Sequence, residues 1–278
     1  MRYRLPVLAA LALVVSLPAS AATVDGIPLH SSSTGKGAKT LIFVHGWTCD
    51  DTSWTEQVPE LSKRYRVITL DLPGHGKSAS PKDGKITMDL FARAVEAVRA
   101  ESGVDKVILV GHSMGTPVIR QYARLYPQHV VALVAVDGVL VFGAPPPGAA
   151  AAPLPQADRM RGPDGLKNRE AMIRGMFTPA TPQPLQQKIL KMMLAAPEST
   201  AYGAMVATFD PAIWKDDVLT IPVLGIYADK SGLANPAATK KIFPAFEYHE
   251  IPGTGHFVML EKPKEFNQLL TQFVETIK

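Results

Sequence analysis

The chain has 278 residues, of which 46% are hydrophobic and 19% are charged, and its formal net charge is +4. This composition is typical of a globular protein with a large buried core and excludes an intrinsically disordered chain. So small a charge imbalance gives no reason to expect a nucleic-acid or other polyanionic partner. Because Cys49 is the only cysteine, an intramolecular disulfide is excluded.

The first 22 residues predict a secretory signal peptide. Two arginines precede an apolar run over residues 5–17, and small residues follow up to Ala22, which is the order of a basic segment, an apolar core and a cleavage site. The run is shorter than a membrane-spanning helix and contains Pro6. We therefore expect cleavage after Ala21 or Ala22, no stable membrane insertion afterwards, and a periplasmic or extracellular location.

Apolar runs alternate with helical patterns through most of the remaining chain. Residues 23–39, rich in Ser, Gly and Lys, predict a leading strand or hairpin. Strand patterns, most of them wholly apolar, occur at residues 41–44, 67–70, 106–110, 130–136, 223–227 and 246–251. Wholly apolar runs suit parallel strands that are covered on both faces. Helical patterns lie between or after them at residues 87–102, 114–126, from Asn235 and Pro236 onward, and at 263–277. This alternation predicts an α/β fold with a doubly wound, mostly parallel sheet.

The alternation is interrupted over residues 140–217. The segment starts with a Pro- and Ala-rich stretch, continues with amphipathic pieces at residues 170–177 and 185–194, and shows no strand pattern. We interpret it as a helical insertion, so that residues 23–139 and 218–278 form the α/β core. Its many Met and aromatic residues are typical of packing, so they identify no pocket residue by themselves.

A serine lies at a sharp strand-to-helix junction in the middle of the chain. The sequence GHSMG at residues 111–115 follows an apolar strand pattern and opens a helical one. In this context small residues on both sides let the hydroxyl of Ser113 project above the sheet, with the helix N-terminus facing a developing oxyanion. The pattern predicts that Ser113 is a nucleophile.

Three more landmarks accompany the serine motif in a fixed order: FVHGW at residues 43–47, DLPGHGKS at 71–78, and GTGHF at 253–257 followed by EKP at 261–263. With them the chain resembles the α/β-hydrolase fold family over essentially all of its mature length. The resemblance implies an α/β core with a helical cap at residues 140–217. It also implies a serine esterase that acts on a small-molecule ester and needs no cofactor.

A serine hydroxyl needs a base to remove its proton, and histidine is suited to this near neutral pH. His256 lies on a Gly-rich loop after the last predicted strand, at the sheet edge where the strands' carboxyl ends open. We therefore expect His256 to be the general base. His112 is expected to pack beside the serine, while His45 and His75 lie in loops that shape the site.

The oxyanion hole requires two backbone N–H donors. The resemblance places them at Trp47 and Met114. The Trp47 side chain has the alternative role of a pocket wall, and Cys49 nearby is more typical of a small buried residue than of a second nucleophile.

Two aspartates compete for the role of the acid that orients His256. The resemblance implies an acid about four residues beyond the strand at 223–227, but Ser231 stands there and Asp229 precedes it. A known variant places the acid after the strand at 130–136, where Asp137 stands. Asp137 is our first choice and Asp229 the alternative.

Other chemistries find less support in the sequence. GHGKS at residues 74–78 ends like a phosphate-binding loop, but Asp71 occupies the place of the required first glycine. No spacing of His, Cys or carboxylates indicates a metal site. Within the same fold, aminopeptidase, carbon–carbon hydrolase, thioesterase, lactonase and haloperoxidase activities remain alternatives, as does a non-catalytic binding protein. Dehalogenases and epoxide hydrolases are disfavoured because they have Asp where this chain has Ser113.

Overall fold

The computed structural model describes residues 22–142 and 155–278. Apart from Ala22, the predicted signal peptide lies outside the described residues, as do residues 143–154 of the predicted insertion. Within the two described ranges, no helix is both long enough and apolar enough to cross a bilayer.

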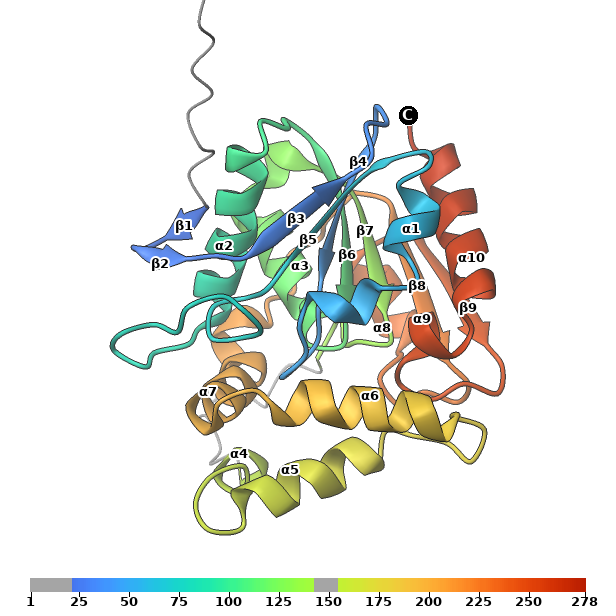
Figure 1. Cartoon of the computed structure of the whole chain (residues 1–278). Coiled ribbons are helices and arrows are strands. Elements are labelled where there is room, and N and C mark those ends of the chain that lie inside the picture. Colours follow the sequence, from blue (N-terminus) through green and yellow to red (C-terminus); the bar gives the residue numbers. More distant parts are fainter. Residues whose placement is uncertain (1–21, 143–154) are drawn as a thin grey trace, which may run out of the picture.

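A seven-stranded sheet with the order β3-β5-β4-β6-β7-β8-β9 forms the centre of the molecule (Figure 1). Neighbouring strands are parallel except for β3 and β5, which confirms the mostly parallel sheet. The strands are β3 (Ser31–Thr34), β4 (Thr40–Val44), β5 (Arg66–Leu70), β6 (Val107–His112), β7 (Val130–Val136), β8 (Val223–Ala228) and β9 (Phe246–Ile251). Every residue of β4, β6 and β8 is buried, because helices cover both faces of the inner strands.

A separate two-stranded hairpin precedes the sheet. Strands β1 (Thr23–Val24) and β2 (Ile27–Pro28) pair in antiparallel fashion. Asp25 and Gly26 join them with φ angles of 50° and 74°, and an Asp-Gly pair suits such a two-residue turn because glycine adopts positive φ without steric cost. The segment at residues 23–39 therefore contains both a hairpin and a leading strand, β3.

Helices on both faces of the sheet make the fold doubly wound. Figure 1 shows α2 and α3 on one side and α1 and α10 on the other. Thr87 caps α2, since its hydroxyl accepts a hydrogen bond from the Leu90 amide at 3.1 Å. The core helices are α1 (Val58–Leu61), α2 (Met88–Glu101), α3 (Gly115–Leu125), α8 (Pro236–Ile242), α9 (Val258–Glu261) and α10 (Pro263–Thr276), with short 3₁₀ helices η1 (Asp51–Trp54), η2 (Pro127–His129) and η3 (Pro211–Ile213).

Four helices between β7 and β8 lie together along one edge of the sheet (Figure 1). They are α4 (Pro155–Asp158), α5 (Gly165–Arg174), α6 (Gln183–Leu194) and α7 (Glu198–Thr208), and we call residues 155–208 the helical segment. Helix α7 joins this segment to the core: its Ala201 carbonyl accepts from Trp47 Nε1 at 2.8 Å, and its Thr200 hydroxyl donates to the Gly74 carbonyl at 3.0 Å.

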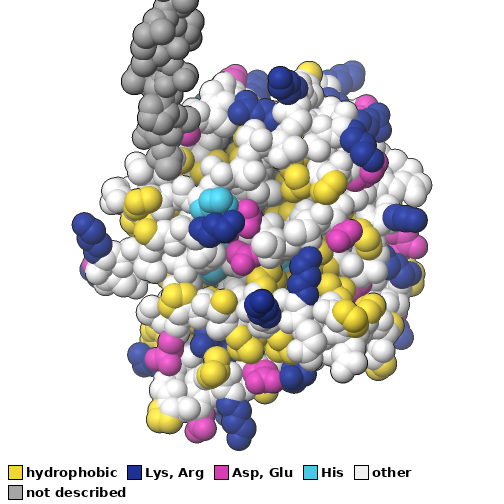
Figure 2. All heavy atoms as spheres, viewed as in Figure 1, with side chains coloured by type: hydrophobic (Ala, Val, Ile, Leu, Met, Phe, Trp, Pro, Cys, Tyr) yellow, Lys and Arg dark blue, Asp and Glu magenta, His cyan; other side chains and the backbone are white. Residues whose placement is uncertain are grey.

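Charges of both signs are interspersed on the face that Figure 2 shows. Lysines and arginines alternate there with acidic side chains rather than gathering in one area. This face therefore presents no single-sign field that would steer a polyanion.

Candidate active site

Ser113 lies on a strained turn between β6 and α3. Its φ angle is +52°, a conformation that is uncommon for residues other than glycine. The flanking glycines are required by space, because a Cβ on Gly111 would lie 2.3 Å from the Gly115 carbonyl oxygen, and one on Gly115 would lie 2.3 Å from the Val44 carbonyl oxygen. The Ser113 amide donates to the Val136 carbonyl at 2.9 Å. These contacts hold the turn between β4 and β7.

His256 meets Ser113 across 143 residues of sequence. Its Nε2 lies 2.8 Å from Ser113 Oγ, which is within hydrogen-bond distance for proton transfer. The loop after β9 carries His256, and only 12% of the histidine side chain is exposed. The nucleophile and base predicted from the sequence therefore lie in contact at the edge of the sheet.

Asp137 holds the other side of the His256 ring. Its Oδ2 lies 2.6 Å from His256 Nδ1, and its Oδ1 accepts from the Ala228 amide at 3.0 Å. Burial raises the pKa of the Asp137 carboxyl, but the hydrogen bond and charge of His256, with donors at Ala228 and Ser231, outweigh burial and hold that pKa below its ordinary value. The carboxylate is thus ionised and fixes the ring with Nε2 toward Ser113.

Asp229, the alternative acid, does not touch the imidazole. It lies just beyond β8, is exposed, and accepts one long hydrogen bond, from the Gly253 amide at 3.3 Å. Its side chain instead lines the cavity in front of the serine. Of the two candidate carboxylates, the structure brings only Asp137 to His256.

Two free backbone amides lie beside the serine. Trp47 and Met114 both line the cavity, and within the described residues neither amide donates to a protein acceptor. Met114 also occupies the N-cap position of α3, where the helix dipole favours negative charge. The Trp47 side chain is fixed by its bond to Ala201, so its ring contributes to the wall while its amide stays available.

A cavity of about 610 Å³ opens in front of Ser113. The side chains that line the cavity from the helical segment are mostly apolar, and Thr178 and Thr208 are the polar ones. The apolar side chains from that segment and the loops next to it are Ala171, Met172, Met176, Phe177, Met205 and Phe209. The sequence indicated an apolar insertion but could not say which of its residues face the serine.

Three buried histidines surround the site without lining the cavity. Burial lowers the pKa of His45, and it lowers those of His75 and His112 to about 3, so all three stay neutral. His112 Nε2 lies 2.9 Å from the His256 carbonyl oxygen, and because a carbonyl only accepts, Nε2 carries the proton. His112 packs beside the serine as expected. His45 and His75 contact the backbone of the loop after β5, at Leu72 and Pro73.

The loop of His256 is attached to the helical segment. The His256 amide donates to the Met176 carbonyl at 3.1 Å. Glu261 Oε2 accepts from the Gly255 amide at 2.9 Å and from the Thr181 hydroxyl at 3.1 Å. The position of the His256 ring thus depends on contacts of its loop with Met176 and Thr181 of the helical segment and with Glu261 of α9.

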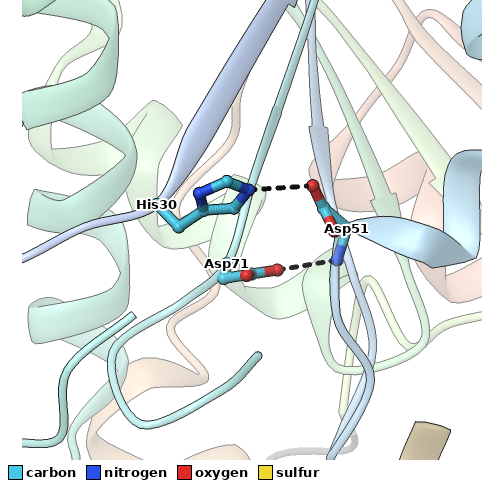
Figure 3. A group of neighbouring side chains, drawn as sticks. All are labelled: His30, Asp51 and Asp71. Carbon is cyan, nitrogen blue, oxygen red and sulfur yellow. Dashed lines mark hydrogen bonds and ion pairs between the residues drawn. The ribbon is translucent and has the colours of Figure 1, made fainter. Parts of the chain in front are cut away.

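A second polar group, away from this cavity, joins three distant parts of the chain. Figure 3 shows His30, Asp51 and Asp71 directed toward one another, and one ligand atom from each lies within 4.8 Å of the others. Asp71, however, already accepts from the amides of Asp51 and Lys77, at 2.7 and 2.8 Å. The Lys77 ammonium lies 3.4 Å from His30 Nε2, so a metal ion would compete with a resident cation. Sequence spacing could not reveal this group.

Cys49 is unsuited to act as a nucleophile. Its side chain is buried, and burial raises the pKa of the thiol to about 12. A thiol that stays protonated is a poor nucleophile. Cys49 therefore offers no alternative to Ser113.

Comparison with known proteins places this geometry in a family context. Residues 39–263 match the family model of the alpha/beta hydrolase fold. A thermophilic esterase of known structure from Thermogutta terrifontis is 26% identical, with a TM-score of 0.79 over 92% of this chain and 96% of the esterase. A 2-hydroxy-6-oxononadienedioate/2-hydroxy-6-oxononatrienedioate hydrolase from Paraburkholderia phymatum is 27% identical, and the match covers 88% of this chain and 90% of the relative.

Two other relatives are longer proteins. Dihydrolipoyllysine-residue acetyltransferase components of acetoin cleaving systems from Cupriavidus necator and Pseudomonas putida are 39% identical over 42% of this chain and 28% identical over 86% of it, respectively. This chain spans 31% and 64% of their respective lengths.

Proposed function

Because this chain belongs to the alpha/beta hydrolase fold family, we propose that it is a serine hydrolase that cleaves carboxylic esters through an acyl-enzyme. The observation that carries the proposal is the continuous contact from Asp137 through His256 to Ser113, with distances of 2.6 and 2.8 Å. This arrangement is the one that activates a serine hydroxyl.

The proposed reaction has two halves. In the first, Ser113 Oγ attacks the ester carbonyl while His256 Nε2 takes the hydroxyl proton, and the proton then passes to the departing alcohol as the C–O bond breaks. In the second, water attacks the acyl-enzyme, His256 takes a proton from that water, and the proton returns to Ser113 as the acid is released.

Three groups stabilise charge during both halves. The amides of Trp47 and Met114 are available to the oxyanion, and removing one such donor costs roughly a hundredfold to a thousandfold in rate in serine hydrolases. Asp137 stabilises the imidazolium that forms on His256. The residues that carry the chemistry thus supply the nucleophile, the proton carrier and the electrostatic stabilisation without a bound cofactor in any step.

The cavity and one structural relative support an ester as the substrate. Its apolar wall suits the acyl or alcohol part of a small to medium ester, and the structural relative from Thermogutta terrifontis is described as an esterase. We propose that the insertion at residues 140–217 acts as a cap, since five of its Met and Phe side chains, together with Ala171, face the serine.

We also propose that the protein is exported. The support is the order of basic, apolar and small residues over positions 1–22. Cleavage there would release the α/β core and the cap into the periplasm or the medium.

A labelling experiment tests the proposed chemistry. The purified protein is treated with a fluorophosphonate probe and assayed on aryl esters of graded acyl length, with matched amides and lactones alongside. We expect stoichiometric labelling and ester hydrolysis, both abolished by Ser113→Ala, while Ser231→Ala, which removes the other serine among the described residues of the cavity wall, is still labelled. A folded protein that takes no label would indicate a binding protein instead, and faster cleavage of amides or lactones would indicate a different substrate class.

A further inference from the structure

In the part of the chain that the structure describes, the cavity wall has acidic side chains and no lysine or arginine. Asp137, Asp229 and His256 are the ionisable side chains among the described residues that line it. Asp137 is buried against the His256 ring, and only 3% of its side chain is exposed. The exposed carboxylate of the wall is therefore that of Asp229.

Asp229 is available to a ligand. Its side chain is exposed. Within residues 22–142 and 155–278, its one hydrogen bond is the 3.3 Å contact from the Gly253 amide, and it forms no ion pair. Lys230 is the adjacent residue, but it does not line the cavity. Because few protein groups contact this carboxylate, it can interact directly with a charged group on a bound molecule.

A second carboxylate lies directly behind the wall. Glu261 Oε2 accepts from Gly255 and Thr181, while Oε1 is buried without a hydrogen-bond partner in the described part of the chain. No described lysine or arginine pairs with Glu261. Glu261 thus places a second acidic side chain next to the loop of His256.

We propose that these charges restrict the substrates to esters that are neutral or positively charged beyond the reacting carbonyl, with Asp229 as the residue that sets the preference. The inference rests on the proposed esterase function and deepens it. A substrate carboxylate would face Asp229, with Glu261 behind the wall, and no described lysine or arginine lines the cavity to pair with it; such like-charge contacts are how sites reject ligands. A substrate ammonium would be attracted to Asp229 and to the ring faces of Phe177 and Phe209, which line the same cavity.

Three p-nitrophenyl esters of equal reach test the preference. Their acyl groups are 4-(trimethylammonio)butanoyl, its neutral isostere 5,5-dimethylhexanoyl, and the glutaric monoester, which ends in a carboxylate. At low ionic strength we expect kcat/KM to be highest for the cationic ester and at least about tenfold lower for the anionic one. The ratio should shrink in 0.5 M salt, because salt screens charges at exposed sites.

Variants of Asp229 test whether this residue sets the preference for cationic over anionic esters. Asp229→Asn is expected to reduce the cation-to-anion ratio about tenfold, and Asp229→Lys to favour the anionic ester, whereas Asp216→Asn, an exposed aspartate outside the cavity, should leave the ratio as in the wild type. If the neutral ester is not hydrolysed and no serine is labelled, the proposed function fails. If the neutral ester is hydrolysed but the anionic one is cleaved equally well, or the ratio survives both Asp229 variants with their folds intact, this inference is overturned.

Discussion

His112 Nε2 donates a hydrogen bond to the carbonyl oxygen of His256 at 2.9 Å, so the residue before the proposed nucleophile holds the backbone of the proposed base. The two rings also pack together, with centroids 4.8 Å apart. Because the contact is made by a neutral imidazole, it introduces no positive charge beside the imidazolium that the proposed reaction forms on His256. His112 is therefore a positioning residue for the base.

Loss of this contact should slow turnover more than it weakens binding. We expect His112→Phe, which keeps a ring but removes the donor, to lower kcat about tenfold to a hundredfold with little change in KM, since a small displacement of a reacting group has an effect of that size. His112→Gln retains a donor and should recover part of the loss. An unchanged kcat in a folded His112→Phe protein would show that the hydrogen bond does not position the base.

The choice of acid can be tested by two amide substitutions. Asp137→Asn removes the acceptor that fixes the His256 ring, and we expect kcat to fall about ten-thousandfold on an aryl ester, as for comparable triads. Asp229→Asn should retain a kcat at least about a hundredfold above that of Asp137→Asn, because Asp229 does not contact the ring. The reverse order of the two rates would assign the role to Asp229.

The last glycine of the serine motif, Gly115, should tolerate no side chain. We expect Gly115→Ala to destabilise the fold by about 3 kcal/mol or more, because its Cβ would lie 2.3 Å from the Val44 carbonyl oxygen. Gly232→Ala is the matched control, since a Cβ there meets no atom within 4 Å. Thermal unfolding of both variants measures the difference, and equal melting temperatures would contradict the crowding at the turn.

Buried neutral histidines predict loss of stability in acid. The pKa values of His75 and His112 are about 3 in the folded protein, whereas unfolded imidazoles titrate near 6.5. Unfolding therefore takes up about two extra protons between these values, so the stabilisation is complete above about pH 6.5 and falls by roughly 2.7 kcal/mol per pH unit as the pH drops toward 3.

Denaturant unfolding at a series of pH values measures this slope. His75→Asn removes one of the two groups and should reduce the slope by about half, with the exposed His249→Asn as control. A free energy of unfolding that stays constant between pH 6.5 and 4.5 would contradict the assignment of neutral, buried rings.

The predicted leader gives a direct test of export. Expressed in a bacterium with its own N-terminus, the protein is expected in the periplasmic or culture fraction, with Ala22 or Thr23 as its first residue by mass spectrometry. Replacement of Arg2 and Arg4 by Glu should retain the full-length chain in the cytoplasmic fraction, because the basic segment of a leader is needed for its function. An uncleaved wild-type chain in the cytoplasm would rule out the leader.

Local sequence was sufficient for the parts of the fold that depend on local rules. The inner strands were predictable because burial on both faces leaves runs such as residues 41–44 wholly apolar, and the Thr87 cap begins α2 where the pattern begins. Helix α7 was missed, since Thr200, Ala201 and Ala204 face the core and such small residues give little periodic contrast with the exposed side.

The site was predictable to the extent that a motif fixes a backbone conformation. The turn at Ser113 is such a case, because its glycines are required by contacts that any chain with this turn must make. The choice between Asp137 and Asp229 depended on where β7 and β8 end in space, which their own residues do not specify. The partners of Glu261 and the wall around Met176 likewise depend on how a distant segment packs.

The hydrogen bond between the His256 amide and the Met176 carbonyl has a consequence for attempts to change what this protein accepts. Substitutions in the helical segment that alter substrate selectivity would also displace the His256 ring. A library of variants of this segment should therefore show changed substrate preference together with a lower kcat. Directed evolution of such libraries would then need compensating changes around the base before new specificities reach useful rates.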